Sequence, residues 1–205
     1  MSGFVKICGL TDEAAVRAAL ECGADAIGFV FATSPRQVSP QRAAELALPA
    51  RGRALCIAVT LHPSQSAADA IIDGFAPDAL QTDIEDFIHL KLPGTLARLP
   101  VVRSGGGADL AASHARVLFE GPRSGSGRVA DWDAARRLAA RCETILAGGL
   151  GPDNVAEAIA EVQPFGVDVS SGVESAPGRK DPLRIAEFIE RARGAFAHRI
   201  QRAHT

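Results

Sequence analysis

The sequence has 205 residues, of which 47% are hydrophobic and 22% are charged, which suits one globular domain over residues 1–205 with a full apolar core. A net charge of −2 with scattered basic residues argues against a nucleic-acid partner, and no stretch approaches the roughly 18 apolar residues of a membrane-spanning helix. The N-terminus carries no signal-peptide pattern, so we expect a cytoplasmic protein with reduced cysteines.

Apolar runs of strand length alternate with segments of helical periodicity along the chain. The predicted strands cover residues 4–8, 25–30, 54–60, 78–82, 99–103, 116–119, 144–147 and 165–169. The predicted helices cover residues 12–23, 40–48, 63–75, 131–142, 152–162 and 181–196, with weaker helical patterns over 83–92 and 107–114. Residues after about 195 are interpreted as a polar tail or an extension of the last helix.

Eight strands that alternate with helices predict a parallel sheet whose faces are both covered. Two architectures compete, a closed (β/α)₈ barrel and an open doubly wound sheet. The count of eight units matches the barrel, and no GxGxxG motif follows the first strand, which disfavours a dinucleotide-binding fold. We therefore expect an α/β protein with a single (β/α)₈, or TIM, barrel.

The first and last strands carry charged residues within apolar runs. Because side chains alternate across a strand, Lys6 and Cys8 are assigned to the barrel interior, as is Asp168. Phe165 and every second residue after it are assigned to the outward face. The first and last strands are neighbours in a closed barrel, and a buried charge is costly unless paired, so we expect Lys6 to meet Asp168 near the mouth.

Cys8 ends the first strand, at the face of a barrel where active sites lie. A nearby ammonium group favours the thiolate, so Lys6 is expected to activate this cysteine. The alternative is that Cys8 is a small buried hydrophobic residue, which is the common role of a free cysteine. We accept that second interpretation for Cys22, Cys56 and Cys142.

Turns rich in small residues follow the seventh and eighth strands, where barrels often bind phosphate. Small residues expose backbone N–H groups, and a helix N-terminus, here expected at Pro152, adds a positive dipole end. The alternative is that these residues only make tight turns. The candidate phosphate-binding residues are Gly148, Gly149, Ser170, Ser171 and Gly172.

Three more residues at predicted strand ends or loops carry charge. Arg36 follows the second strand and is a candidate to bind an anion at the other end of the substrate. Glu120 ends the sixth strand and is a candidate general acid, and Asp83, which ends the fourth, is an alternative. For Arg36, a solvated arginine on a surface loop is ordinarily the more common interpretation. Glu120 and Asp83 could equally be solvated loop residues or helix caps. The five histidines have no metal-ligand spacing, so we expect no metal.

Five segments in order, "VKICGLT", "GADAIGFVFATSPRQVSP", "GSGRVADW", "ILAGGLGPDNV" and "GVDVSSGVESAPGRKD", resemble the phosphoribosylanthranilate isomerases of tryptophan biosynthesis. The resemblance runs from about residue 4 to 190. It implies a (β/α)₈ barrel without a cofactor. It also implies an Amadori rearrangement of N-(5-phosphoribosyl)anthranilate, an aminoaldose, into the aminoketose 1-(2-carboxyphenylamino)-1-deoxyribulose 5-phosphate.

The resemblance also implies roles for individual positions. Cys8 would be the general base, Arg36 would hold the anthranilate carboxylate, and Asp168 would position the substrate beside Lys6. The glycine pair and the "SSG" turn would hold the phosphate. The family's acid is usually an aspartate in an "LLD" or "FDA" context, whereas "LFEGP" offers Glu120 here. The family's "QLHG" reads "QTDI", so Asp83 stands where a histidine is common.

Two other kinds of protein remain as alternatives. One is a related phosphate-binding barrel enzyme, such as an indole-glycerol-phosphate synthase or a sugar isomerase. The other is a barrel without catalytic activity that binds a phosphorylated ligand. The sequence shows no interface, so a monomer and a homodimer are both compatible with it.

Overall fold

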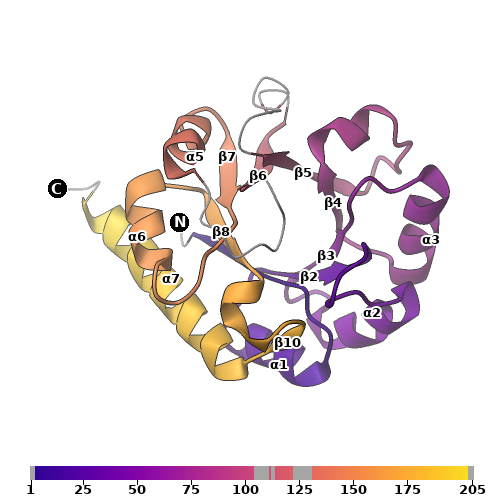
Figure 1. Ribbon diagram of the computed structural model, residues 1–205, viewed down its shortest axis with the longest axis horizontal. Coiled ribbons are helices and arrows are strands. Elements are labelled where there is room, and N and C mark those ends of the chain that lie inside the picture. The colour runs from indigo at the N-terminus through magenta and orange to yellow at the C-terminus, as the bar shows by residue number, and fades with distance from the viewer. Residues whose placement is uncertain (1–2, 104–110, 112–113, 122–130, 203–205) are drawn as a thin grey trace.

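The computed structural model describes residues 3–103, 111, 114–121 and 131–202. Strands β1 to β8 form a closed barrel in chain order, each parallel to its neighbours, with helices on the outside (Figure 1). Strand β1 pairs with both β2 and β8, which closes the ring. The expected (β/α)₈ barrel is therefore confirmed.

The strands lie close to their predicted positions. Their bounds are β1 Phe4–Cys8, β2 Ala26–Val30, β3 Leu55–Val59, β4 Ala79–Asp83, β5 Ala97–Arg103, β6 Arg116–Glu120, β7 Glu143–Leu146 and β8 Gly166–Val169. The α-helices are α1 Glu13–Glu21, α2 Pro40–Ala47, α3 Gln65–Phe75, α5 Trp132–Ala139, α6 Val155–Val162 and α7 Pro182–Arg202. Short 3₁₀ helices cover Leu48–Ala50, Ile84–Ile88 and Ser171–Val173, and the strands β9 Glu174–Ala176 and β10 Arg179–Lys180 form a hairpin.

Side chains before four helices fix where each helix begins. Asp12, Ser39, Ser64 and Asp131 each accept a hydrogen bond from the backbone N–H three residues further on. Such a cap satisfies one of the N–H groups that a helix leaves without an internal partner, and it stabilises a helix by about 1 kcal/mol. These capped helices all lie within the segments that the sequence predicts to be helical.

Apolar side chains form two separate layers. The larger layer lies between the strands and the surrounding helices. The smaller one fills the barrel interior with one or two side chains from most strands: Ala26, Ile57, Ala79, Leu99, Val101, Leu118, Ile145 and Ala147. Since the interior is packed with side chains, a ligand can enter only at an end of the barrel.

Phe165 does not lie on the outward face, as the alternation of side chains predicts. It packs against the interior layer, and its ring stacks on that of Phe4 with the centroids 5.8 Å apart. Phe165 stands just before the first residue of β8, at the N-terminal end of the barrel. A side chain at a strand end is free to turn inward, and here both rings are partly buried against the interior layer.

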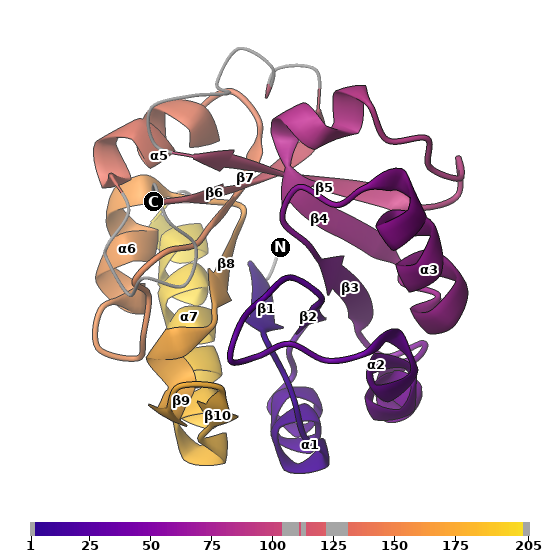
Figure 2. The ribbon, with the colours of Figure 1, turned by 45° about the vertical axis from the view of Figure 1, so that its right-hand side comes forward.

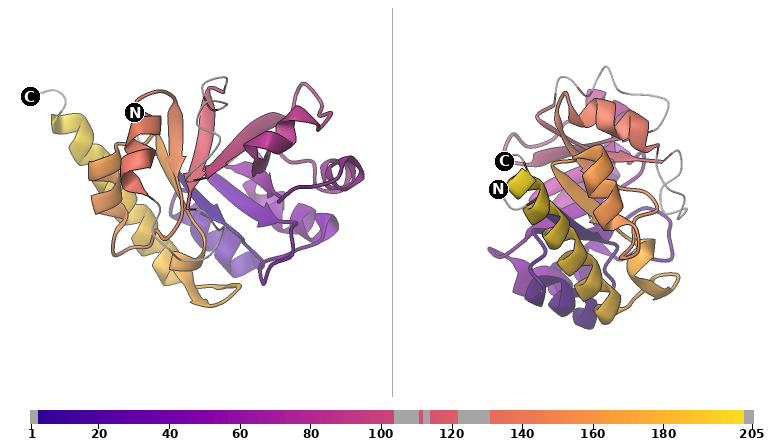
Figure 3. Two further views of the ribbon diagram at one scale, coloured as in Figure 1. Left: turned by 45° about the horizontal axis from the view of Figure 1, so that its top comes forward. Right: turned by 90° about the vertical axis from the view of Figure 1, so that its left-hand side faces the viewer.

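The two segments with weaker helical patterns, residues 83–92 and 107–114, differ in what the structure shows. Residues 84–88 form a 3₁₀ helix, and residues 107–114 lie mostly outside the described part of the chain. The last helix continues beyond residue 195 to Arg202, so that part of the chain extends the helix. Helix α7 runs along the outside of the barrel between α1 and α6, and the hairpin of β9 and β10 lies beside its first turns (Figures 2 and 3).

Candidate active site

Buried charges gather at the C-terminal ends of the strands. Every charged side chain that is buried among the described residues belongs to this region. They are Lys6, Asp83, Glu120, Asp168, Glu174 and Lys180. Burying a charge costs free energy unless partners compensate it, so such a concentration indicates a site that the fold stabilises for a purpose other than packing.

Lys6 and Asp168 meet as predicted. They are in register on the adjacent strands β1 and β8, and Lys6 Nζ donates to Asp168 Oδ1 at 2.8 Å. The Lys6 side chain is fully buried. Burial by itself lowers the pKa of Lys6, but attraction to Asp168 and to Cys8 outweighs it, and the pKa lies above its usual value.

Cys8 lies directly beside this pair. Its register partner is Gly28, and a Cβ atom added to Gly28 would lie 3.1 Å from Cys8 Sγ and 3.2 Å from Lys6 Nζ. Any larger residue at position 28 would therefore crowd both groups. Burial raises the pKa of the Cys8 thiol, and although Lys6 and Lys180 lower it, they do not reverse the shift. Lys6 therefore does not bring the pKa of Cys8 below its usual value, because burial outweighs its attraction and the charge of Asp168 opposes it.

The two candidate phosphate loops touch each other. Gly148 and Gly149 have φ angles of +87° and +70°, a backbone conformation that favours glycine. A Cβ on Gly172 would lie 1.9 Å from the carbonyl oxygen of Leu150, so only glycine allows this approach. Ser170 and Ser171 stand in the same turn after β8, at the start of the Ser171–Val173 helix. The structure therefore brings together the residues expected to bind phosphate.

Helix α6 begins three residues later than predicted. Pro152 stands in the turn before the helix, and Asn154 occupies the N-cap position before Val155. The Asn154 carboxamide stabilises the turn, since its Oδ1 accepts from Gly151 N and its Nδ2 donates to the Gly149 carbonyl, both at 2.9 Å. The asparagine side chain thus holds the backbone of the glycine turn at both Gly149 and Gly151.

Arg36 reaches the site from the loop after β2, but its guanidinium is already paired. Its Nε and Nη2 donate to Oε1 and Oε2 of Glu174 at 2.6 and 2.8 Å. Lys180 Nζ also donates to Glu174 Oε1 at 2.8 Å and to the Ser170 carbonyl at 2.9 Å. These contacts place Arg36 next to the loop after β8.

The two candidate acids share one arginine. Arg103, the last residue of β5, donates through Nη2 to Asp83 Oδ1 and through Nη1 to Glu120 Oε1, each at 2.6 Å. On the other side of Asp83 lies His62, with Nε2 3.3 Å from Asp83 Oδ2 and Nδ1 2.9 Å from Asp86 Oδ1. The hydrogen bond to Asp86 raises the pKa of His62 above its usual value. The mouth therefore holds proton donors and acceptors in contact with one another.

Sequence reasoning missed four residues of this site: His62, Arg103, Glu174 and Lys180. Arg103 and Glu174 could have been found, since Arg103 is the residue that ends the predicted fifth strand and Glu174 is one of the two acidic residues of the "GVESAPGRKD" segment. Lys180 belongs to the same segment and could have been found with Glu174. His62 carries no such signal, because its partners Asp83 and Asp86 are distant in sequence. Within the described part of the chain, no helix is long and apolar enough to cross a membrane, and no three His, Cys, Asp or Glu side chains are grouped to hold a metal ion.

These observations define a class of protein. A closed (β/α)₈ barrel that places a thiol, several carboxylates and glycine-rich loops at the C-terminal ends of its strands is a barrel enzyme built for acid–base chemistry on an anionic substrate.

Comparisons with known proteins identify the family. Residues 5–191 match the family model described as N-(5'phosphoribosyl)anthranilate (PRA) isomerase. A curated N-(5'-phosphoribosyl)anthranilate isomerase from Rhizobium etli is 40% identical, over 96% of this chain and 97% of its own length. The crystal structure of phosphoribosyl anthranilate isomerase from Thermotoga maritima is 30% identical, covers 94% of this chain and 99% of its own, and superposes with a TM-score of 0.82.

Another similar structure contains a ligand. It is a phosphoribosyl anthranilate isomerase in complex with reduced 1-(o-carboxyphenylamino)-1-deoxyribulose 5-phosphate, 30% identical, covering 94% of this chain and 99% of its own, with a TM-score of 0.80. The Thermotoga maritima enzyme is also described as dimeric. The present chain belongs to the N-(5'-phosphoribosyl)anthranilate isomerase family, and it is an isomerase of tryptophan biosynthesis.

Proposed function

We propose that this protein converts N-(5-phosphoribosyl)anthranilate into 1-(2-carboxyphenylamino)-1-deoxyribulose 5-phosphate with its own side chains as acid and base. The observation that carries the proposal is the position of Cys8, beside the Lys6–Asp168 pair at the C-terminal end of β1, in a chain that matches the isomerase family over residues 5–191. The reaction moves hydrogen within one molecule, so it needs no external oxidant or reductant.

Two proton transfers involving side chains lead to an enolamine, which then tautomerises. In the first, Glu120 gives a proton to the furanose ring oxygen, the bond from C1 to that oxygen breaks, and the anthranilate nitrogen forms a Schiff base with C1. In the second, the Cys8 thiolate removes the proton from C2, which gives an enolamine that tautomerises to the ketone. A positioned acid and a positioned base each contribute about 10²–10⁴-fold in rate.

The remaining residues bind the two anionic ends of the substrate. Arg36 takes the anthranilate carboxylate, and residues 148, 149 and 170–172 take the phosphate through backbone N–H and hydroxyl groups. Asp168, which Lys6 holds in place, positions the sugar between them. The touching loops after β7 and β8 support this assignment, because two loops that meet can surround one phosphate from both sides.

Glu120 and Asp83 are the two candidate acids, and both contact Arg103. Glu120 is proposed because it ends β6, where the family usually has its acid, while Asp83 is held on two sides by Arg103 and His62. Asp83 then serves to orient Arg103. The longer glutamate side chain reaches the ring oxygen from the end of β6.

The test is turnover of freshly generated phosphoribosylanthranilate, followed by the loss of anthranilate-type fluorescence. We expect Glu120→Gln to lose roughly 100-fold or more in kcat, the scale for removing an acid, and Asp83→Asn to lose less. The reverse order would assign the acid to β4. Folded wild-type protein without any turnover would contradict the proposed function and favour a barrel that only binds a phosphorylated ligand.

A further inference from the structure

We propose that Glu174 is a positioning residue that orients the Arg36 guanidinium for the carboxylate of the substrate. The proposal rests on the proposed function, under which Arg36 binds that carboxylate. Glu174 acts through Arg36 and does not itself touch the substrate. Its partner Lys180 fixes the same assembly to the loop after β8.

Glu174 occupies one edge of the guanidinium and leaves the other edge available. The Nε–Nη2 edge of Arg36 is taken by the two carboxylate oxygens, at 2.6 and 2.8 Å. A guanidinium has five N–H donors in one plane, so two paired bonds fix both its plane and its rotation. Within the described part of the chain, Nη1 of Arg36 has no hydrogen-bond acceptor. The Nη1–Nη2 edge can therefore bind a second carboxylate.

Glu174 is itself rigidly held. Lys180 Nζ donates to its Oε1 at 2.8 Å, and Gly178 N donates to its Oε2 at 3.2 Å. Only 5% of the Glu174 side chain is exposed, and none of the Lys180 side chain is. Burial by itself raises the pKa of Glu174, but the hydrogen bonds from Arg36 and Lys180 outweigh it, and the pKa lies below its usual value. Glu174 is consequently an anion at neutral pH.

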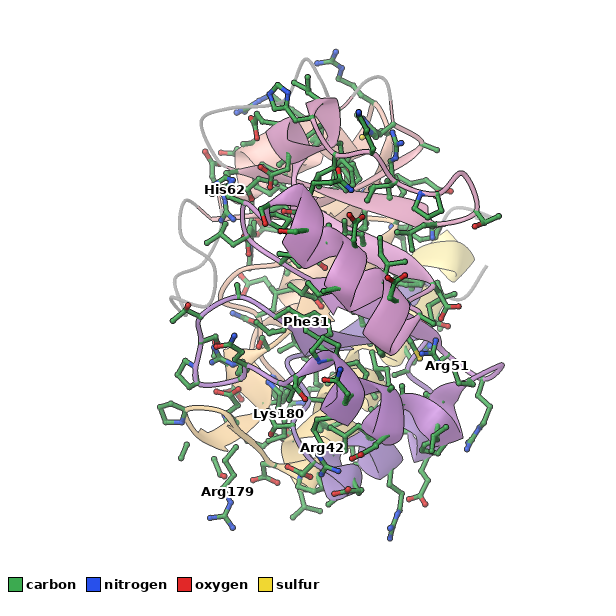
Figure 4. All side chains as sticks on the ribbon, turned by 90° about the vertical axis from the view of Figure 1, so that its right-hand side faces the viewer. Phe31, Arg42, Arg51, His62, Arg179 and Lys180 are labelled. Atoms are coloured by element: carbon green, nitrogen blue, oxygen red, sulfur yellow. The ribbon has the colours of Figure 1, made fainter. Side chains whose placement is uncertain are left out.

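The β9–β10 hairpin carries both Glu174 and Lys180, which face each other in register. Figure 4 shows Arg179 projecting outward from this hairpin, whereas Lys180 lies further inside. Lys180 Nζ also donates to the carbonyl and hydroxyl oxygens of Ser170, at 2.9 and 3.3 Å. A chain of hydrogen bonds thus joins Arg36, through Glu174 and Lys180, to the proposed phosphate loop.

The charges of this assembly suit one incoming carboxylate. Arg36 and Lys180 are two cations that share the single carboxylate of Glu174, so these three side chains together carry one net positive charge. A substrate carboxylate would balance that charge. The same chain of contacts sets the separation between the carboxylate site at Arg36 and the phosphate site at Ser170. The hairpin therefore helps the site to select a substrate with two anionic ends at a defined distance.

The test compares two ligands that differ only in the carboxylate. The first is reduced 1-(o-carboxyphenylamino)-1-deoxyribulose 5-phosphate, and the second is the same compound without the ring carboxylate. Their dissociation constants are measured by calorimetry for the wild type and for Glu174→Gln. Glutamine keeps the size of the side chain, but its NH₂ group replaces an acceptor with a donor that faces other donors.

We expect the wild type to prefer the carboxylated ligand and Glu174→Gln to reduce that preference about tenfold or more, the scale of a lost hydrogen bond between charged groups. The affinity for the second ligand should change far less. Glu143→Gln is the matched control. Glu143, the first residue of β7, pairs with Arg116, the first residue of β6, at the other end of the barrel. This variant should leave both dissociation constants unchanged.

The proposal would be overturned if Glu174→Gln weakened the binding of both ligands equally, or if it left the preference for the carboxylated ligand unchanged. A purely structural role of Glu174 predicts one of these two results. If Glu174→Gln fails to fold, Glu174→Asp keeps the charge on a shorter side chain and should show a smaller loss of preference; an unchanged preference there would overturn the proposal too. A wild type that binds neither ligand would instead contradict the proposed function itself.

Discussion

Replacing Asp168 with asparagine should leave Lys6 as an uncompensated charge inside the barrel. The Lys6 side chain is fully buried, that of Asp168 is only 9% exposed, and the charged atoms lie 2.8 Å apart. Removing one partner of a buried ion pair costs about 3–5 kcal/mol. In a chain of this size each kcal/mol shifts Tm by about 2–4 °C, so the variant should melt roughly 6–20 °C lower.

The stability that Asp168→Asn loses should depend on pH. In the wild type the pKa of Lys6 is raised, because Asp168 and Cys8 outweigh the lowering by burial. Its stabilising contribution is therefore complete below the unfolded value of about 10.4, and it is lost as pH rises through the higher folded value. In Asp168→Asn burial acts without Asp168 and lowers the pKa, so the buried charge disappears sooner. The difference in stability should narrow between pH 7 and pH 10.

Urea unfolding at pH 7 measures this difference for the wild type, for Asp168→Asn and for the double variant Lys6→Met with Asp168→Asn. The double variant should recover most of the lost stability, because it removes both charges from the interior. An Asp168→Asn protein that unfolds within about 0.5 kcal/mol of the wild type, the usual range for surface substitutions, would refute the reasoning.

Two further predictions concern the rim of the site. Gly172→Ala should cost roughly 1–3 kcal/mol of stability and weaken the binding of inorganic phosphate, because its Cβ would lie 1.9 Å from a backbone oxygen. Gly94→Ala, where a Cβ meets nothing within 4 Å, should change neither stability nor phosphate binding. If the two variants behaved alike, the close approach of Gly172 to the Leu150 carbonyl would be contradicted. In an NMR titration, the pKa of His62 should lie above its usual value and fall in Asp86→Asn; a pKa that does not respond would exclude the Asp86 hydrogen bond as its cause. Because 64% of the His62 side chain is exposed, its stabilising effect should be small, complete below about pH 6.5 and lost as pH rises through the raised pKa.

The barrel and the centre of the site could be predicted because they depend on patterns that are local in sequence. Apolar runs locate the strands, and the alternation of side chains places Lys6 and Asp168 on the inner face. Closure of the barrel then makes their two strands neighbours, although the residues lie 162 positions apart. The turns after β7 and β8 are likewise visible in the glycine and serine content of the sequence.

The rest of the site depends on contacts that no local pattern encodes. Arg36 was predicted as a candidate to bind an anion of the substrate, yet its guanidinium is already paired with Glu174, 138 positions away. Arg103 joins two carboxylates from different strands, and His62 reaches Asp83 from a separate loop. Phe165 departs from strand alternation because it stands just before the first residue of β8, where its ring packs on Phe4. The partners of long side chains are set by the tertiary structure, so these contacts can be seen only in the folded protein.

Cys8 is proposed here as the base of a phosphoribosylanthranilate isomerase. The most direct test is the kcat of Cys8→Ser with freshly generated phosphoribosylanthranilate, measured beside the wild type and beside Cys56→Ser, which changes a buried cysteine that packs toward the helices. We predict turnover by the wild type, a loss of about 100-fold or more for Cys8→Ser, and nearly full activity for Cys56→Ser. A Cys8→Ser protein as active as the wild type would contradict the account.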